Sequence, residues 1–144
     1  MHAEPDDLLD QVNALMSALK GQLNQALKGE PDPLAPLEAR ALRYFARHPG
    51  STQAMLAAAT GRDKAQVTRL VKDMLARDQL RKGEGGEDRR SFGLFLTDIG
   101  MAQYKKVQHS RRRLAATMVA GLSAQEQAQL AGLLARVQTN VKLK

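Results

Sequence analysis

The stretch from residue 61 to residue 100 changes its hydrophobic period along its length, and this change limits the fold more than any other feature. Asp63 can cap a helix, because its carboxylate accepts bonds from the free N–H groups of a first turn. The apolar residues that follow recur at helical spacing: Val67, Leu70, Val71, Met74 and Leu75. After Asp78 the pattern becomes that of short strands. The stretch therefore predicts a helix from Asp63 to Ala76 and then a hairpin.

The predicted hairpin has two short arms. Residues 80–84 can extend, Gly85-Gly86 permits a sharp turn, and Phe92, Leu94 and Leu96 alternate as a returning strand does. Thr97 is placed to cap a new helix from Asp98 to about Ala120.

A shorter helix precedes the one at Asp63. Ser51-Thr52 opens it, with Thr52 as the better cap, and it runs through Ala59 with Leu56 and Ala59 facing inward. Met55 stands where a capping box needs an acid or an amide. Gly61 supplies the positive φ that a tight turn requires. The two helices therefore predict a helix-turn-helix, with the helix from Asp63 to Ala76 as its second member.

Another helix is expected from Leu37 to His48, with Pro36 in its first turn and Pro49-Gly50 as its stop. Its inward face is Leu37, Ala41, Leu42 and Phe45. Further helices are expected from Asp6 to Leu27 and after Ser123, and each carries a continuous apolar stripe. With the helix after Thr97, these terminal helices present more apolar surface than a small domain can cover alone. We therefore expect a homodimer in which the first and the last two helices intertwine.

Two short motifs resemble one family of regulators. D-R-R at 88–90, followed by L-T-D-I-G at 96–100, resembles the wing signature of MarR-type winged helix-turn-helix regulators, and V-T-R-L-V at 67–71 resembles their recognition helix. The resemblance covers roughly residues 34–100. It implies a mainly α fold with a small antiparallel β wing and terminal dimerisation helices. The expected parts of a single chain, 1–144, are an N-terminal dimerisation helix (1–33), a DNA-binding region (34–97) and C-terminal dimerisation helices (98–144).

Donor-rich side chains on the polar face of the helix at Asp63 are candidates to read DNA. Gln66 can pair with adenine, and Arg69 or Lys64 with guanine. Thr68 could touch a thymine methyl group or a phosphate, and Lys72 could meet the backbone. Thr52 and Gln53 are candidates for phosphate contacts. The alternative is an ordinary solvated helix face.

The wing supplies the other candidates. The resemblance implies that Asp88 holds an arginine, Arg90, extended toward a minor groove, where the narrow A·T groove attracts a guanidinium. Arg89 would then be free to contact phosphate. The alternative is a surface ion pair between Asp88 and Arg90, worth ~0–1 kcal/mol.

Charge agrees with a polyanionic partner, because the chain has a formal net charge of +7 and a pI near 10.1. The charge is uneven: residues 1–38 hold seven acids and two bases, whereas residues 101–144 hold eight bases and one acid. The run Arg111-Arg112-Arg113 could face the acidic first helix, solvent or DNA.

Other classes of function lack their residues. The chain has no cysteine, and its three histidines have no ligand spacing, so we expect no cofactor and no metal site. No apolar run is long enough to span a membrane, and the acidic start lacks a signal-peptide core, so we expect the cytoplasm. No nucleophile-and-base pair and no phosphate loop is present, which makes an enzyme the least favoured reading.

The resemblance further implies a small-molecule effector, often a phenolic anion, bound between the winged region and the dimerisation helices. Tyr44, Phe45 and Tyr104 are aromatic candidates for that pocket, although core packing explains them equally well. Two alternatives remain open. The chain could bind DNA constitutively without an effector, or it could be a protein–protein adaptor that kept the scaffold and lost DNA contact.

Overall fold

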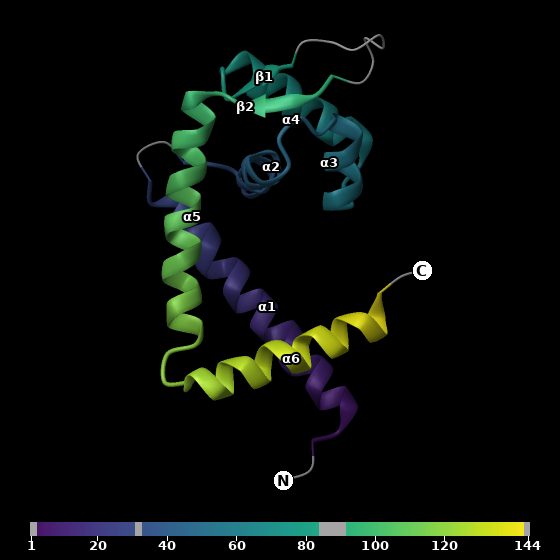
Figure 1. Cartoon of the computed structure of the whole chain (residues 1–144), viewed down its shortest axis with the longest axis vertical. Helices are drawn as coiled ribbons and strands as arrows, with labels where there is room; N and C mark the ends of the chain where they lie inside the picture. Colours follow the sequence, from purple (N-terminus) through teal and green to yellow (C-terminus); the bar gives the residue numbers. More distant parts are fainter. Residues whose placement is uncertain (1–2, 31–32, 84–91, 143–144) are drawn as a thin grey trace. The chain divides into compact units, whose positions relative to one another are not determined.

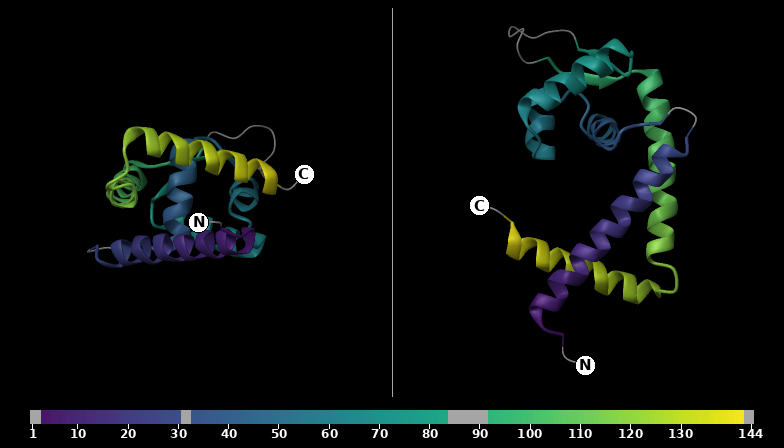
Figure 2. Two further views of the ribbon diagram at one scale, coloured as in Figure 1. Left: turned by 90° about the horizontal axis from the view of Figure 1, so that it is seen from below. Right: turned by 180° about the vertical axis from the view of Figure 1, so that it is seen from behind.

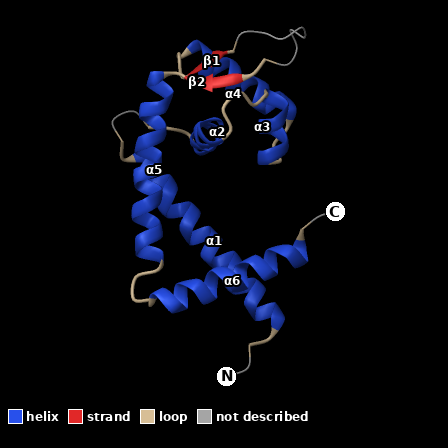
Figure 3. Cartoon of the chain, in the orientation of Figure 1, coloured by secondary structure: helices blue, strands red, loops and turns tan. Residues whose placement is uncertain are grey.

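The computed structural model describes residues 3–30, 33–83 and 92–142, and Figures 1 and 3 show that helices dominate them. In chain order the elements are α1 (Pro5–Lys28), α2 (Pro36–Arg47), α3 (Gln53–Thr60), α4 (Lys64–Ala76), β1 (Leu80–Lys82), β2 (Leu94–Leu96), α5 (Asp98–Met118) and α6 (Ala124–Val141). The chain forms two compact units, Met1–Arg111 and Arg112–Lys144, which divide inside α5. Each unit is described by itself.

The core of the first unit lies where α2, α3 and α4 meet the hairpin, and Figure 2 shows these helices grouped beside it. Its largest fully buried apolar side chains are Phe45, Leu42, Leu56, Met74, Leu80 and Val67. Burying one such side chain contributes roughly 1.5–3 kcal/mol. Because only Phe45 among them is aromatic, the core is built mainly from aliphatic and methionine side chains, in keeping with an aromatic content of 3%.

The ends of α3 and α4 follow the capping predictions. Thr52 caps α3 and accepts from the N–H of Met55 at 3.2 Å, and Asp63 caps α4 and accepts from the N–H of Ala65 at 3.3 Å. Between them Gly61 has φ of 65°, a left-handed conformation that costs glycine little. The predicted helix-turn-helix is therefore confirmed as a local structure.

The start of α2 is capped in a different way. Ala35 has no side chain that can cap, but the Glu38 carboxylate reaches back and accepts from the N–H of Ala35 at 3.2 Å. Glu38 is 5% exposed, and it also accepts from Gln79 Nε2 at 3.0 Å and from Arg77 at 3.4 Å. Gln79 in turn donates to Gln103 of α5 at 2.7 Å. One buried carboxylate thus links the start of α2 to the end of α4 and, through Gln79, to α5.

The two strands pair antiparallel, with Leu80 opposite Leu96 and Lys82 opposite Leu94. The segment after α2 extends this sheet, because the N–H of Leu94 donates to Ser51 O and the N–H of Gly50 donates to Leu94 O, both at 2.9 Å. A Cβ on Gly93 would lie 2.9 Å from Gly50 O, so this close backbone approach requires glycine. The hairpin is therefore fastened at its base to the loop that opens α3.

The joint between α4 and α5 is equally close. Thr97 caps α5, accepting from the N–H of Gly100 at 3.1 Å, and its hydroxyl donates to Asp78 O. Asp78 has φ of 60°, which aspartate adopts more readily than most residues. A Cβ on Gly100 would lie 2.2 Å from Gln79 O. The segment that follows α4, Asp78-Gln79, is therefore held against the first turn of α5.

Helix α6, in the second unit, begins with a full capping box: Glu126 N–H donates to Ser123 Oγ at 3.1 Å, and Ser123 N–H donates to Glu126 Oε1 at 2.9 Å. Its apolar stripe is exposed, with Leu133 at 56%. Helix α1, in the first unit, is exposed in the same way along Leu8, Val12 and Leu15, whereas its last apolar residue, Leu27, is buried against Ala39 and Val107. Within the described residues, no helix combines the length and hydropathy needed to span a bilayer.

Three details of the prediction are wrong. Ala59 is exposed, and Ala57 is the residue that joins Leu56 in the core, because the short α3 presents a different edge to α2. Phe92 precedes β2 and does not belong to it, since pairing begins only at Leu94. Helix α5 ends at Met118, before Gly121 takes φ of 86°.

Candidate nucleic-acid interface

Helix α4 separates its apolar and polar side chains cleanly. Val67, Val71 and Met74 are buried in the core. The predicted reading residues all lie on the exposed side: Lys64, Gln66, Thr68, Arg69 and Lys72. Their positive charges and amide groups therefore face outward from one rigid helix, and the cap at Asp63 fixes where that helix starts. A polar ridge of this kind suits the major groove, which admits one α-helix.

Two of the predicted contact residues, Gln53 and Thr68, form a hydrogen bond with each other. Gln53 Nε2, in the first turn of α3, donates to the hydroxyl of Thr68 on α4, and that hydroxyl donates to Lys64 O at 2.8 Å. The single proton of the Thr68 hydroxyl is therefore used within α4, and the hydroxyl can offer DNA only acceptor capacity. Gln53 keeps one amide proton for a phosphate. Thr52, beside it, has its hydroxyl engaged as the cap of α3.

The base of the hairpin carries two cations that sequence reasoning missed. Arg81 lies over the ring of Phe95, 4.7 Å from its centroid, and Lys82 Nζ lies over the ring of Phe92 at 4.6 Å. Cation–π contacts of this kind hold long side chains in place. The sequence carries a signal for these contacts, because basic residues in one arm of the hairpin face aromatic residues in the other; the apolar alternation alone does not reveal it for Phe92.

The wing residues Asp88, Arg89 and Arg90, and the turn at Gly85-Gly86, lie outside the described residues. The structure does describe the residues that flank that segment. The N–H of Gly83, before it, donates to the carbonyl oxygen of Gly93, after it, at 2.7 Å. The ring of Phe95 lies 2.6 Å from where a Cβ on Gly83 would be. Both ends of the segment are therefore set beside β1 and β2, next to Arg81 and Lys82.

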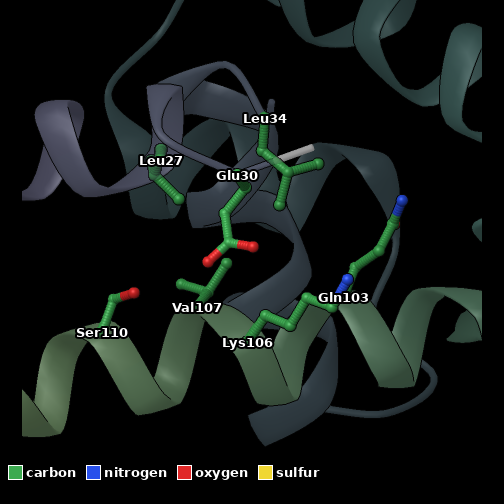
Figure 4. A pocket seen from close by; sticks show the side chains of 7 residues that line it. All are labelled: Leu27, Glu30, Leu34, Gln103, Lys106, Val107 and Ser110. Atoms are coloured by element: carbon green, nitrogen blue, oxygen red, sulfur yellow. The ribbon is translucent and has the colours of Figure 1, made fainter. Parts of the chain in front are cut away.

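The hollow between α1 and α5, one place where the predicted effector could bind, is small. Figure 4 shows a hollow between the end of α1, the segment before α2 and one face of α5, where Glu30 points toward Val107 among apolar side chains. Its volume is about 40 Å³, whereas ligand pockets commonly measure about 300–1,000 Å³. None of the aromatic candidates lines it: Phe45 is in the core, and Tyr44 and Tyr104 pack against that core.

The described part of the chain also shows no group of three histidine, aspartate or glutamate side chains placed to hold a metal ion. The run at Arg111 is divided: Arg112 and Arg113 are exposed, whereas Arg111 is half-buried, and its charge acts on Arg43 of α2.

Comparison with known proteins supports the fold. The chain is similar in structure to the transcriptional regulator SlyA (22% identity, 94% of each chain covered, TM-score 0.78) and to a MarR transcriptional regulator from Methanosarcina mazei Go1 (14%, 96% and 91%, 0.79). It is also similar to a MarR-family protein from Listeria monocytogenes solved with a 26mer DNA (20%, 98% and 90%, 0.79). A search of curated proteins finds no match.

These similarities show the fold, a winged helix-turn-helix with helices at both ends. In sequence, residues 33–91 match the model of the MarR family. That match spans α2, α3, α4 and β1, and so contains every predicted DNA-contact residue. Over this segment, which is less than half of the chain, the sequence is similar to the MarR family.

Proposed function

We propose that this protein is a homodimeric, sequence-specific DNA-binding regulator of transcription that acts in the cytoplasm. The observation that carries the proposal is the exposed donor set of α4, which the family match covers. Gln66 and Arg69 read base edges, while Lys72 and Gln53 contact phosphates. The cations at Arg81 and Lys82 flank the segment that holds Arg90, so positive charge extends from the helix to the wing.

The dimer is part of the proposal. The apolar stripes of α1 and α6 are exposed in the single chain, and exposed apolar patches of this length mark interaction surfaces. A two-fold dimer would place two copies of α4 in successive major grooves, so the operator would be a pseudo-palindrome with half-sites ~34–36 Å apart. Bound within a promoter, such a dimer blocks polymerase, which makes repression the expected outcome.

Binding of an effector is a further part of the proposal, and it depends on more than the single chain. A phenolic acid does not fit a hollow of about 40 Å³ in the single chain. Relief of repression by such a ligand at this place therefore requires a pocket that the second protomer completes or that opens on binding. Melting-temperature shifts across a panel of aromatic acids would measure it, because a ligand that binds only the folded state stabilises it.

The deciding experiment is selection of bound sites from random duplex DNA, followed by titration of the enriched duplex at several salt concentrations. We expect an enriched pseudo-palindrome and an affinity that falls steeply as salt rises, because phosphate contacts release counterions. The adaptor alternative predicts neither enrichment nor salt-dependent binding. If the protein ignores duplex DNA in dilute salt, the proposal fails.

A further inference from the structure

A second hollow of the first unit lies between α2 and the last turn of α3, and its lining is strongly basic. Its volume is about 170 Å³, and it is lined by Arg40, Arg43, Tyr44, Arg47, His48, Ala59 and Thr60. None of these residues belongs to the donor set of α4. Three arginine side chains therefore line one open hollow that the proposed DNA interface does not use.

The arginines lie on one face of α2, because positions 40, 43 and 47 are spaced by three and four residues. Like charges at this spacing repel each other. Among residues 3–30, 33–83 and 92–142, no carboxylate forms an ion pair with any of the three. A cation in the last turn, such as Arg47, stabilises the helix end. That effect does not explain Arg40 and Arg43, which lie further from the end.

The middle arginine is the most constrained. Arg43 is half-buried, and burial lowers the pKa of its guanidinium, as do the nearby charges of Arg111 and Arg47. A fixed cation crowded by two others in a partly dehydrated place is stabilised by a bound anion. The opposite wall is not a donor, because the hydroxyl of Thr60 already donates to Leu56 O at 2.9 Å. The binding groups are therefore those of α2.

The shape of the donor set favours a phosphate group over a carboxylate. A phosphate monoester carries close to two negative charges at neutral pH and three acceptor oxygens, whereas a carboxylate has one charge and two oxygens in a plane. Guanidinium groups bind phosphate with paired hydrogen bonds. Tyr44 and His48, whose ring centroids lie 4.8 Å apart, also line the hollow. The volume accepts a small anion or one anionic group of a larger molecule.

We infer that the α2–α3 hollow is a phosphate-binding site, filled by free phosphate or by the phosphate of a small metabolite. A bound phosphate would fill the space between α2 and the last turn of α3, and only Gly61, Arg62 and Asp63 separate that turn from α4. The anion would therefore bias the position of the recognition helix and change its affinity for DNA. This second step rests on the proposed function, whereas binding of phosphate does not.

The site is tested without DNA, by titrating the full-length protein with potassium phosphate against potassium chloride of equal ionic strength. Calorimetry or ³¹P line broadening reports binding. Arg43→Gln should weaken phosphate at least about tenfold, the loss of one charge-assisted hydrogen bond. Arg43→Lys, which keeps the charge and loses the planar fork, should weaken it less. Arg112→Gln removes the same charge from an exposed site and should change affinity less than about twofold. Arg40→Gln, at an exposed position, gives a second variant should Arg43→Gln fail to fold.

The inference is overturned if phosphate binds no better than chloride, or if Arg112→Gln weakens it as much as Arg43→Gln. Glycerol 3-phosphate distinguishes the two sources of phosphate, because a metabolite site binds the ester more tightly than free phosphate. Succinate tests the choice of phosphate over carboxylate, and tighter binding of succinate overturns it. If phosphate does not bind but Arg43→Gln weakens duplex DNA tenfold, the patch contacts the DNA backbone instead. If wild-type protein binds phosphate but no DNA, the proposed function fails and the site stands.

Discussion

Single residues decide how tightly α2, α4 and α5 are joined, and Glu38 is the clearest case. Its carboxylate is buried, while its partner Arg77 is 68% exposed. An exposed ion pair contributes little, whereas a buried acceptor of an amide and a backbone N–H contributes more. Most of the stabilisation from this network therefore comes from the hydrogen bonds that Gln79 and the N–H of Ala35 donate to Glu38, and much less comes from the salt bridge.

Glu38→Ala should lower the free energy of unfolding by roughly 2–3 kcal/mol, because the buried Gln79 amide loses one of its two acceptors and the N–H of Ala35 loses its partner. Arg77→Ala, the matched control, should cost less than ~1 kcal/mol. Urea unfolding at one protein concentration measures both. Equal costs for the two variants would show that the ion pair is the stabilising element.

Substitutions on the exposed face of α4 should differ in the property of DNA binding that they alter. Arg69→Ala should cost ~1–3 kcal/mol on the selected operator and relax preference at one base pair. Lys72→Ala should weaken all duplexes alike and reduce the salt dependence by about one counterion. Fluorescence anisotropy with the operator and a scrambled duplex separates the two. A uniform effect of Arg69→Ala would remove it from base reading.

The wing arginine gives a separate prediction. Arg90→Ala should weaken operator binding at least about tenfold, since an arginine in a narrow minor groove is held by its negative potential. Its melting temperature should stay unchanged, because position 90 lies beyond the hairpin base that packs on the core. A gel-shift titration in which Arg90→Ala matches the wild type would contradict the wing role.

Elements were predicted well where local chemistry determines them. Thr52, Asp63, Thr97 and Ser123 each cap the helix assigned to them, because a capping side chain and the first turn lie within three residues. Tertiary contacts were not accessible in this way. The roles of Glu38 and of Gly93 depend on partners about forty residues away in the chain, which no spacing rule identifies.

The candidate site, too, could be predicted from the sequence only in part. The exposed face of α4 follows from its period, so its donors could be placed from the sequence. The contact of Gln53 with Thr68 could not, because it depends on the crossing of α3 and α4. The cations at Arg81 and Lys82 needed the strand register, which begins two residues later than the apolar alternation indicates.

The joint between α4 and α5 yields a prediction at this scale. Gly100→Ala should cost at least about 2 kcal/mol, because the new methyl group would meet the Gln79 carbonyl, and backbone must move. Gly21→Ala, in open space within α1, should instead stabilise by ~0.5–1 kcal/mol through helix propensity. Thermal unfolding of both proteins at equal concentration gives the comparison. A neutral Gly100→Ala would mean that α5 shifts freely relative to α4.

For the whole molecule, the proposed dimer can be tested with one charge on either face of α6. Leu133→Glu places a carboxylate in the exposed apolar stripe and should shift the protein to monomer in sedimentation velocity. Operator affinity should fall with it, because two half-sites are no longer bound together. Thr139→Glu adds the same charge on the opposite face of the helix. A dimer that survives Leu133→Glu but not Thr139→Glu would place the interface elsewhere.

The close approach of Gly50 and Gly93 has a consequence for how such a protein can diversify. Because the hairpin is anchored where it begins, insertions, deletions or charge reversals beyond Gly83 would leave the folded body beneath it intact. Changes of target preference in that segment can thus arise without loss of thermal tolerance. The same boundary, from Gly83 to Gly93, is a natural place to graft segments from relatives and obtain regulators with new operators.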